Sequence, residues 1–166
     1  MRQAIDVTSE TERFPEFYRR EYPRLARASL LLTGSVVDAE DLTQEALARV
    51  YERWDQVSAM DSPEGYLYRT AMNLHKKALR RLAVRARVIV ERSERDDLQV
   101  AEDRLEVLRA VAALPRAQRE ALVLVEWLGF DADEAGRLLG VEAVSVRTRL
   151  HRARAGLRER FGGKDV

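Results

Sequence analysis

The chain has 166 residues, 46% of them hydrophobic, with 29 lysines and arginines, 28 aspartates and glutamates, two histidines and no cysteine. This composition is typical of one or two small folded domains and excludes a disordered polyelectrolyte. Without cysteine there is no disulfide scaffold, thiolate nucleophile or cysteine-bound zinc, and two distant histidines do not form a metal site. No apolar run reaches the roughly 18 residues of a membrane span, and the first residues lack the apolar core of a signal peptide. We therefore expect a cytoplasmic protein with no membrane insertion.

Positive and negative charges are sorted along the chain although the net charge is only +1. Seven basic residues and no acidic one lie between Glu64 and Glu91. A second stretch, from Arg147 to Arg160, holds six arginines against Glu159 alone. Two basic stripes predict a polyanion bound at two places, with solvated helical faces as the alternative.

Apolar residues recur with helical spacing, and no segment alternates convincingly like a strand. The first predicted helix begins near Phe14, is kinked or divided at Pro23, and ends at Gly34. Asp38 is expected to cap a second helix, whose apolar stripe over 42–54 leaves polar residues on another face. The first half of the chain is thus predicted to be a helical bundle.

A third helix is expected to open at Ser62 and Pro63 and to turn the first basic stripe outward. Residues 86–103 lose the apolar spacing and are acidic, so we interpret them as a flexible linker. A linker of this kind predicts two domains that move independently unless a partner clamps them. Two further helices are expected beyond it, the first ending near Pro115 and the second at Gly129.

Residues 131–160 have the layout of a helix-turn-helix. Gly140 supplies the positive φ that the turn needs, and Ser145 is expected to cap the second helix. Arg147 and Arg152 would face outward near the start of that helix, and arginine can donate two hydrogen bonds to a guanine edge. An ordinary helical hairpin is the alternative.

Three motifs together resemble a known family. They are DAEDLTQEALARVYERW (38–54), SPEGYLYRTAMNLHKKALRR (62–81) and the segment 113–161, in which VRTRLHRAR (146–154) is the most specific piece. The chain resembles the extracytoplasmic-function group of bacterial RNA polymerase sigma factors, especially the sigma-E-like proteins of actinobacteria. The resemblance implies an all-α fold of two small helical domains: a region 2-like domain over 1–85, a linker over 86–103, and a region 4-like helix-turn-helix domain over 104–166.

The resemblance also implies functional residues. The resemblance assigns docking on RNA polymerase to Asp41, Gln44 and Glu45. The resemblance assigns binding of the melted minus-ten element to Arg69, Asn73, Lys76, Lys77, Arg80 and Arg81. The loop over 57–62 would hold an extruded base. The resemblance assigns binding of the minus-thirty-five duplex to Ser145, Arg147, Thr148, Arg149, His151, Arg152 and Arg154. Of these, Arg147, Thr148, His151 and Arg152 would read the major groove, and Arg149 and Arg154 would lie nearer the phosphates.

The implied function is that of a promoter-specificity factor whose partners are core RNA polymerase, promoter DNA and, as often in this family, an anti-sigma factor. No catalytic residue, cofactor or metal is expected, and the chain is not expected to be an enzyme. A stand-alone helix-turn-helix regulator is the main alternative, but it leaves the acidic face at 41–45 unexplained, and a helical adaptor leaves the terminal arginines unexplained. We expect Trp54 and Trp127 in the core, and His75 and His151 exposed or on DNA.

Overall fold

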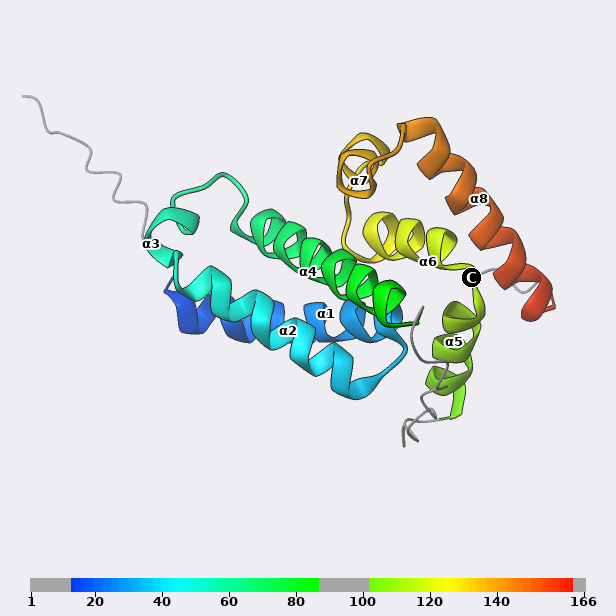
Figure 1. Ribbon diagram of the computed structural model, residues 1–166, viewed down its shortest axis with the longest axis horizontal. Coiled ribbons are helices and arrows are strands. Elements are labelled where there is room, and N and C mark those ends of the chain that lie inside the picture. Colours follow the sequence, from blue (N-terminus) through cyan, green and yellow to red (C-terminus); the bar gives the residue numbers. More distant parts are fainter. Residues whose placement is uncertain (1–12, 87–101, 163–166) are drawn as a thin grey trace, which may run out of the picture.

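The computed structural model describes residues 13–86 and 102–162, and the secondary structure within these ranges is entirely helical, which confirms the expected fold class (Figure 1). The first unit comprises α1 (Phe14–Thr33), α2 (Val36–Tyr51), α3 (Trp54–Val57) and α4 (Pro63–Ala86). The second unit comprises α5 (Glu102–Ala113), α6 (Arg116–Leu122), the π-helical η1 (Val123–Trp127), α7 (Ala132–Leu139) and α8 (Ala143–Arg160). No helix in these two ranges is long and apolar enough to cross a membrane.

The linker proposed for residues 86–103 lies outside the described residues except at its ends. Ala86 is still the last residue of α4, and α5 already begins at Glu102. The two helices therefore extend slightly into the segment that composition assigns to the linker.

Helix α1 runs unbroken through Pro23, so the predicted division there is wrong. A proline inside a helix removes one backbone hydrogen bond, but here the turns on both sides of it are anchored by Phe17 and Leu25, which are fully buried. The helix ends at Gly34 as predicted, with a φ of 71° and its N–H bonded to the Leu30 carbonyl at 2.8 Å. Packing thus outweighs the cost of the proline.

The start of α2 differs by three residues from the prediction. Ser35, and not Asp38, is the N-cap, because the Ser35 hydroxyl accepts the Asp38 N–H at 3.3 Å. Asp38 lies in the first turn, where its negative charge favours the positive end of the helix dipole. At α4 the prediction is confirmed: Pro63 is the first helical residue, and the Ser62 hydroxyl accepts the Gly65 N–H at 3.1 Å.

The second unit contains the predicted helix-turn-helix, formed by α7 and α8. Asp131 and Glu134 close a capping box at the start of α7, and Gly140 ends that helix with a φ of 70°. The predicted cap of α8 is wrong: Glu142 is its N-cap, without a side-chain bond, and Ser145 lies in the first turn. The chain turns so tightly between the helices that a Cβ on Gly136 would lie 2.6 Å from the Val141 carbonyl oxygen.

The two units pack against each other in this structure. Independent movement of the two domains stays a prediction. A single cluster of buried side chains runs from Phe17 and Leu25 of α1 through Leu67 of α4 to Leu124 of η1 and Val146 of α8. Helix α1 contacts α5, α6 and η1, and α4 contacts α7. We call this contact between the units the seam.

We predict that Gly136→Ala destabilises the chain whereas Gly156→Ala does not. The new methyl at 136 would press on turn backbone and cost about 1–3 kcal/mol in spite of the better helix propensity of alanine. At 156, in the middle of α8, the methyl would meet only Leu114 Cδ2 at 3.5 Å, so we expect a gain of up to about 1 kcal/mol. Denaturant unfolding of the two variants measures both. Equal stabilisation by both would contradict the tight turn.

Candidate nucleic-acid interface

The outer face of α2 presents the three residues expected to dock on polymerase. Asp41, Gln44 and Glu45 are all exposed, while Ala46 and Val50 on the opposite side of the helix are buried in the bundle. Helix α2 contacts other elements of the first unit, principally α1 and α4. The structure therefore brings these three side chains together on one free, mainly acidic surface, in which Glu45 also pairs with Arg49 at 2.6 Å.

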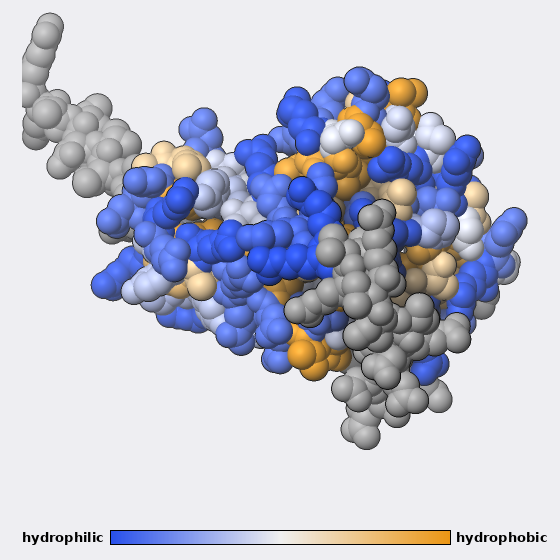
Figure 2. All heavy atoms as spheres, in the orientation of Figure 1, coloured by the Kyte–Doolittle hydropathy of each residue, from blue (hydrophilic) through white to orange (hydrophobic). Residues whose placement is uncertain are grey.

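The basic stripe of α4 faces outward for most of its length, and Figure 2 shows a band of hydrophilic side chains across the position of this helix. Most of the residues expected at the melted strand are exposed: Arg69, Asn73, Lys77, Arg80 and Arg81. Lys76 is half-buried, because its ammonium group donates to the Leu138 carbonyl of α7 at 2.8 Å. Arg69 is also paired across the seam, with Glu134 at 3.4 Å.

The outward face of α8 carries the residues expected to read duplex DNA. Val146, Leu150 and Ala153 are buried against α6 and α7 and fix the rotation of the helix. The exposed members of the predicted set are Arg147, Thr148, His151, Arg152 and Arg154, and the half-buried ones are Ser145 and Arg149.

Internal contacts hold several of these side chains in place. The Thr148 hydroxyl donates to the Val144 carbonyl at 2.9 Å, which leaves its methyl group as the outward contact. Arg147 lies 3.9 Å from Asp133 of α7, and Arg154 is paired with Glu126. Arg154 is thus held toward η1, away from the first turns of α8.

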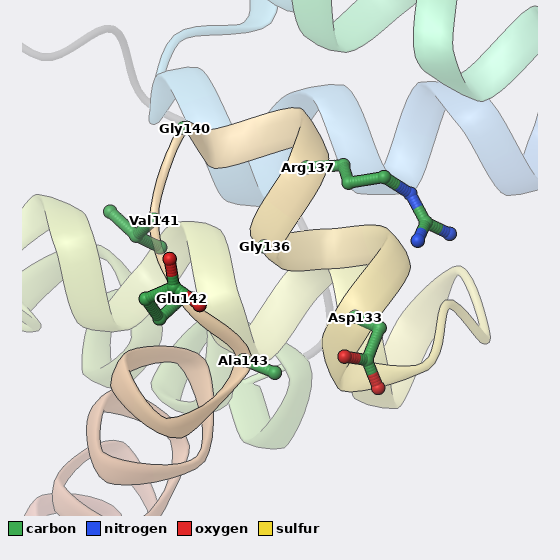
Figure 3. Close-up of a pocket in the computed structure, with 7 residues that line it drawn as sticks. All are labelled: Asp133, Gly136, Arg137, Gly140, Val141, Glu142 and Ala143. Atoms are coloured by element: carbon green, nitrogen blue, oxygen red, sulfur yellow. The ribbon is translucent and has the colours of Figure 1, made fainter.

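A shallow hollow lies at the turn between α7 and α8, lined by Asp133, Gly136, Arg137, Gly140, Val141, Glu142 and Ala143. In Figure 3 the Arg137 side chain extends from α7 away from the turn. The lining is mostly polar side chain and turn backbone, which does not resemble the apolar lining of small-molecule sites. Within the described ranges no group of three acidic or histidine side chains converges on a point that could hold a metal ion.

The seam contains contacts between the units that the sequence analysis did not predict. Arg24 of α1 donates to the Trp127 carbonyl at 3.2 Å, and the Trp127 indole donates back to the Arg24 carbonyl at 3.3 Å. The Arg24 guanidinium also lies 5.6 Å from the centre of the Tyr68 ring, which meets Phe130 edge to face. Trp127 is 39% exposed, so its expected place in the core is wrong, whereas Trp54 packs against the core as expected.

Tyr68 also closes a polar contact inside the first unit. Its hydroxyl donates to the buried carboxylate of Glu21, which is held on its other side by Arg20 at 2.7 Å. Burial and the Glu21 carboxylate raise the pKa of Tyr68 far above its ordinary value, so the hydroxyl remains a donor at all physiological pH values.

His75 is buried at 4% exposure, so its expected exposure is wrong, whereas His151 is exposed as expected. It lies in the seam, with Nε2 3.7 Å from the Glu120 carboxylate of α6, and that carboxylate is already paired with Arg116 at 2.9 Å. Burial, and the positive charges of Arg116 and Arg119, lower the pKa of His75 from 6.5 to about 4. The imidazole is therefore neutral in the packed structure.

Comparison with known proteins places both units in one family. Residues 17–85 match the profile of Sigma-70 region 2, and residues 104–157 match that of Sigma-70, region 4. The RNA polymerase sigma-E factor of Streptomyces coelicolor is 31% identical over 160 residues, covering 95% of this chain and 90% of the relative. The chain belongs to the extracytoplasmic-function group of RNA polymerase sigma factors. The ECF RNA polymerase sigma factor SigE of Mycolicibacterium smegmatis is 35% identical, covering 93% of this chain and 65% of the relative.

Solved structures share the fold of this sigma factor. The sigma factor RpoE of Bartonella quintana, in complex with the anti-sigma factor NepR, is 22% identical with a TM-score of 0.75, covering 92% of this chain and 98% of that one. CnrH in complex with the cytosolic domain of CnrY gives a TM-score of 0.57 at 22% identity, covering 92% and 89%. The resemblance inferred from the motifs is confirmed: this is a promoter-recognition sigma factor, and nothing in these comparisons supports a stand-alone helix-turn-helix regulator.

We predict that His75 makes folding of this sigma factor pH-dependent. In the unfolded chain His75 binds a proton below pH 6.5, whereas in the folded chain it does so only near pH 4. The contribution of neutral His75 to the free energy of unfolding is therefore fully present above pH 6.5 and decreases as the pH falls. Between pH 7.5 and 5 this amounts to about 2 kcal/mol. Urea unfolding at several pH values measures it against His75→Asn, which titrates no imidazole there. Parallel pH profiles for the two proteins would refute the effect.

Proposed function

We propose that this sigma factor docks on core RNA polymerase through Asp41, Gln44 and Glu45. The observation that supports this is the shared exposure of the three side chains on a face of α2 that packs against nothing else in the described structure. Acidic and amide side chains on one such face fit a basic partner surface, and complementary charge speeds encounter and fixes register.

We further propose that α4 follows the melted non-template strand of the minus-ten element. Arg69, Asn73, Lys76, Lys77, Arg80 and Arg81 would line the strand backbone, and the loop after α3 would hold an extruded base. Val57, included in that loop from the sequence, is the buried last residue of α3, so the proposed base pocket is confined to 58–62. The exposed basic side chains beyond Lys76, which are Lys77, Arg80 and Arg81, support this role.

The first turns of α8 are proposed to read the minus-thirty-five element in the major groove. Arg147, Thr148, His151 and Arg152 are the base-contacting candidates, because they are exposed on those turns. Ser145, Arg149 and Arg154 are assigned to the phosphates. Arg154 would first have to leave Glu126.

The proposal also includes the location of the protein, its cofactor requirement and a further partner. We take it to be a non-enzymatic transcription factor of the cytoplasm that needs no cofactor. The sigma factor RpoE of Bartonella quintana was solved in complex with the anti-sigma factor NepR, so we propose an anti-sigma factor as a third partner of this chain. Co-purification from the host with and without core polymerase tests that partner.

We predict that the double variant Asp41→Lys, Glu45→Lys binds core polymerase at least about tenfold more weakly, because it reverses both carboxylates of the proposed surface. A matched control, Glu106→Lys with Glu159→Lys, applies the same charge change to exposed positions of the second unit. Fluorescence titration with core polymerase compares them, with circular dichroism to verify folding. The assignment is wrong if both double variants bind alike.

We predict that Arg147→Ala and Arg152→Ala each cost about 1–3 kcal/mol on a matched promoter duplex and relax the preference at one or two base pairs. Arg158→Ala, two turns further along α8, is the control and should weaken binding equally on matched and scrambled duplexes. It should also lower the salt slope by about one charge. Titrations over a salt series decide. Equal losses on both duplexes for Arg147→Ala and Arg152→Ala would remove these residues from base readout.

A further inference from the structure

An aliphatic side chain lies on the outward face of α8, in its first turn. Val144 is 63% exposed and is not one of the side chains that pack on the core of the described structure. The buried residues of this helix are Val146, Leu150 and Ala153. At about 100° of rotation per residue, Val144 lies on the side of the helix opposite to these three. It therefore faces away from the protein.

Folding alone gives no reason for a valine at this position. A β-branched side chain is a poorer helix former than alanine, and Val144 buries little surface in return. A single exposed apolar residue is ordinary on a protein surface. What Val144 can contact is therefore decided by its neighbours on the helix.

The neighbours of Val144 on this face are one methyl group and two arginines. Thr148 lies one helical turn further on, and its hydroxyl donates to the Val144 carbonyl at 2.9 Å. The methyl group is the part of the Thr148 side chain that remains for an outward contact. Arg147 and Arg152 are exposed and lie on either side of this pair around the helix. The face thus has an aliphatic centre between two cations.

The chemistry of the major groove restricts what such a centre can recognise. In a helix-turn-helix, the residues near the start of the second helix are those that reach base edges. Most groups exposed there are hydrogen-bond donors or acceptors, and the apolar one is the 5-methyl group of thymine. An arginine guanidinium only donates hydrogen bonds, so Arg147 and Arg152 are suited to acceptors such as guanine edges and phosphates.

We propose that Val144 is a specificity-determining residue that contacts the 5-methyl group of a pyrimidine in the minus-thirty-five duplex. In unmodified DNA that pyrimidine is thymine. The proposal rests on the proposed role of α8, and it adds the chemical group that this face reads between its arginines.

Replacing thymine by uracil isolates this contact, because uracil keeps the hydrogen-bonding groups of thymine and lacks only the methyl group. Burial of one methyl group predicts a loss of affinity of about three- to fivefold when it is removed. Contacts of the arginines with guanine and phosphate are left intact by the replacement. The effect of uracil therefore reports the aliphatic contact separately from the rest of the face.

The experiment uses the full chain bound to core polymerase. A duplex site is selected from a library with about 12 randomised base pairs, slightly more than one turn of B-DNA. Each thymine of the selected site, on either strand, is then replaced by uracil, and affinities are measured by fluorescence anisotropy. The proteins are the parent, Val144→Ala and the control Val107→Ala, which removes the same atoms from a 49% exposed valine on α5.

We expect one or two uracil replacements to weaken binding of the parent and of Val107→Ala by about three- to fivefold. Val144→Ala should bind the thymine and uracil forms of those sites alike. Thr148→Ser removes the neighbouring methyl but keeps a hydroxyl for the Val144 carbonyl, so it should retain most of the uracil effect.

A cytosine series distinguishes the methyl group from thymine as a whole. At each sensitive position the pair is changed to cytosine with guanine, and to 5-methylcytosine with guanine. Because 5-methylcytosine places its methyl group where thymine does, the parent should bind the methylated duplex more tightly than the unmethylated one. Val144→Ala should bind these two duplexes equally.

The proposal is overturned if every thymine of the selected site tolerates uracil, if Val144→Ala keeps the uracil effect, or if Thr148→Ser alone abolishes it. Weaker binding of Val144→Ala to core polymerase without DNA would overturn it as well, by assigning the valine to a protein contact. Circular dichroism verifies folding, which alanine favours at this helical position.

Failure of this proposal is distinguishable from failure of the proposed role of α8. Losses confined to the matched duplex for Arg147→Ala and Arg152→Ala, with no uracil effect in the parent, would overturn the Val144 contact alone. Equal losses on matched and scrambled duplexes for the two arginine variants would overturn base readout by those arginines.

Discussion

A single buried apolar cluster and two hydrogen bonds exchanged between Arg24 and Trp127 join the two halves of this sigma factor. Arg24 donates to the Trp127 carbonyl and packs on the Tyr68 ring, and the Tyr68 ring meets Phe130 edge to face. Phe130 directly precedes the capping box that starts α7. The contact of Arg24 with Trp127 and the bond from Lys76 to the Leu138 carbonyl therefore join the two units at two places.

Each unit meets most of the cost of its buried polar groups from its own residues. Glu21, His75 and Glu120 are buried, and a buried polar group is costly unless it has a partner. Tyr68 and Arg20 serve Glu21 within the first unit, and Arg116 serves Glu120 within α6. His75 faces the Glu120 carboxylate across the seam at 3.7 Å, and its buried Nε2 has no hydrogen-bond partner in the described structure.

Sequence periodicity predicts most of the helices and the exposure of all three proposed faces, because these depend on spacing within one helix. It misplaces the N-caps of α2 and α8. It predicts Asp38 instead of Ser35 and Ser145 instead of Glu142, because the N-cap depends on where the chain enters the helix. The seam is not predictable this way. The spacing of residues around Trp127 or His75 does not indicate that each side chain contacts a residue of the other unit. The acidic segment between the units predicts that they are separate.

The two DNA faces differ in what supports them. The face of α8 is fixed inside its own unit, by the capping box of α7 and by the close approach of the turn to Gly136. The face of α4 shares its central cation with the end of α7.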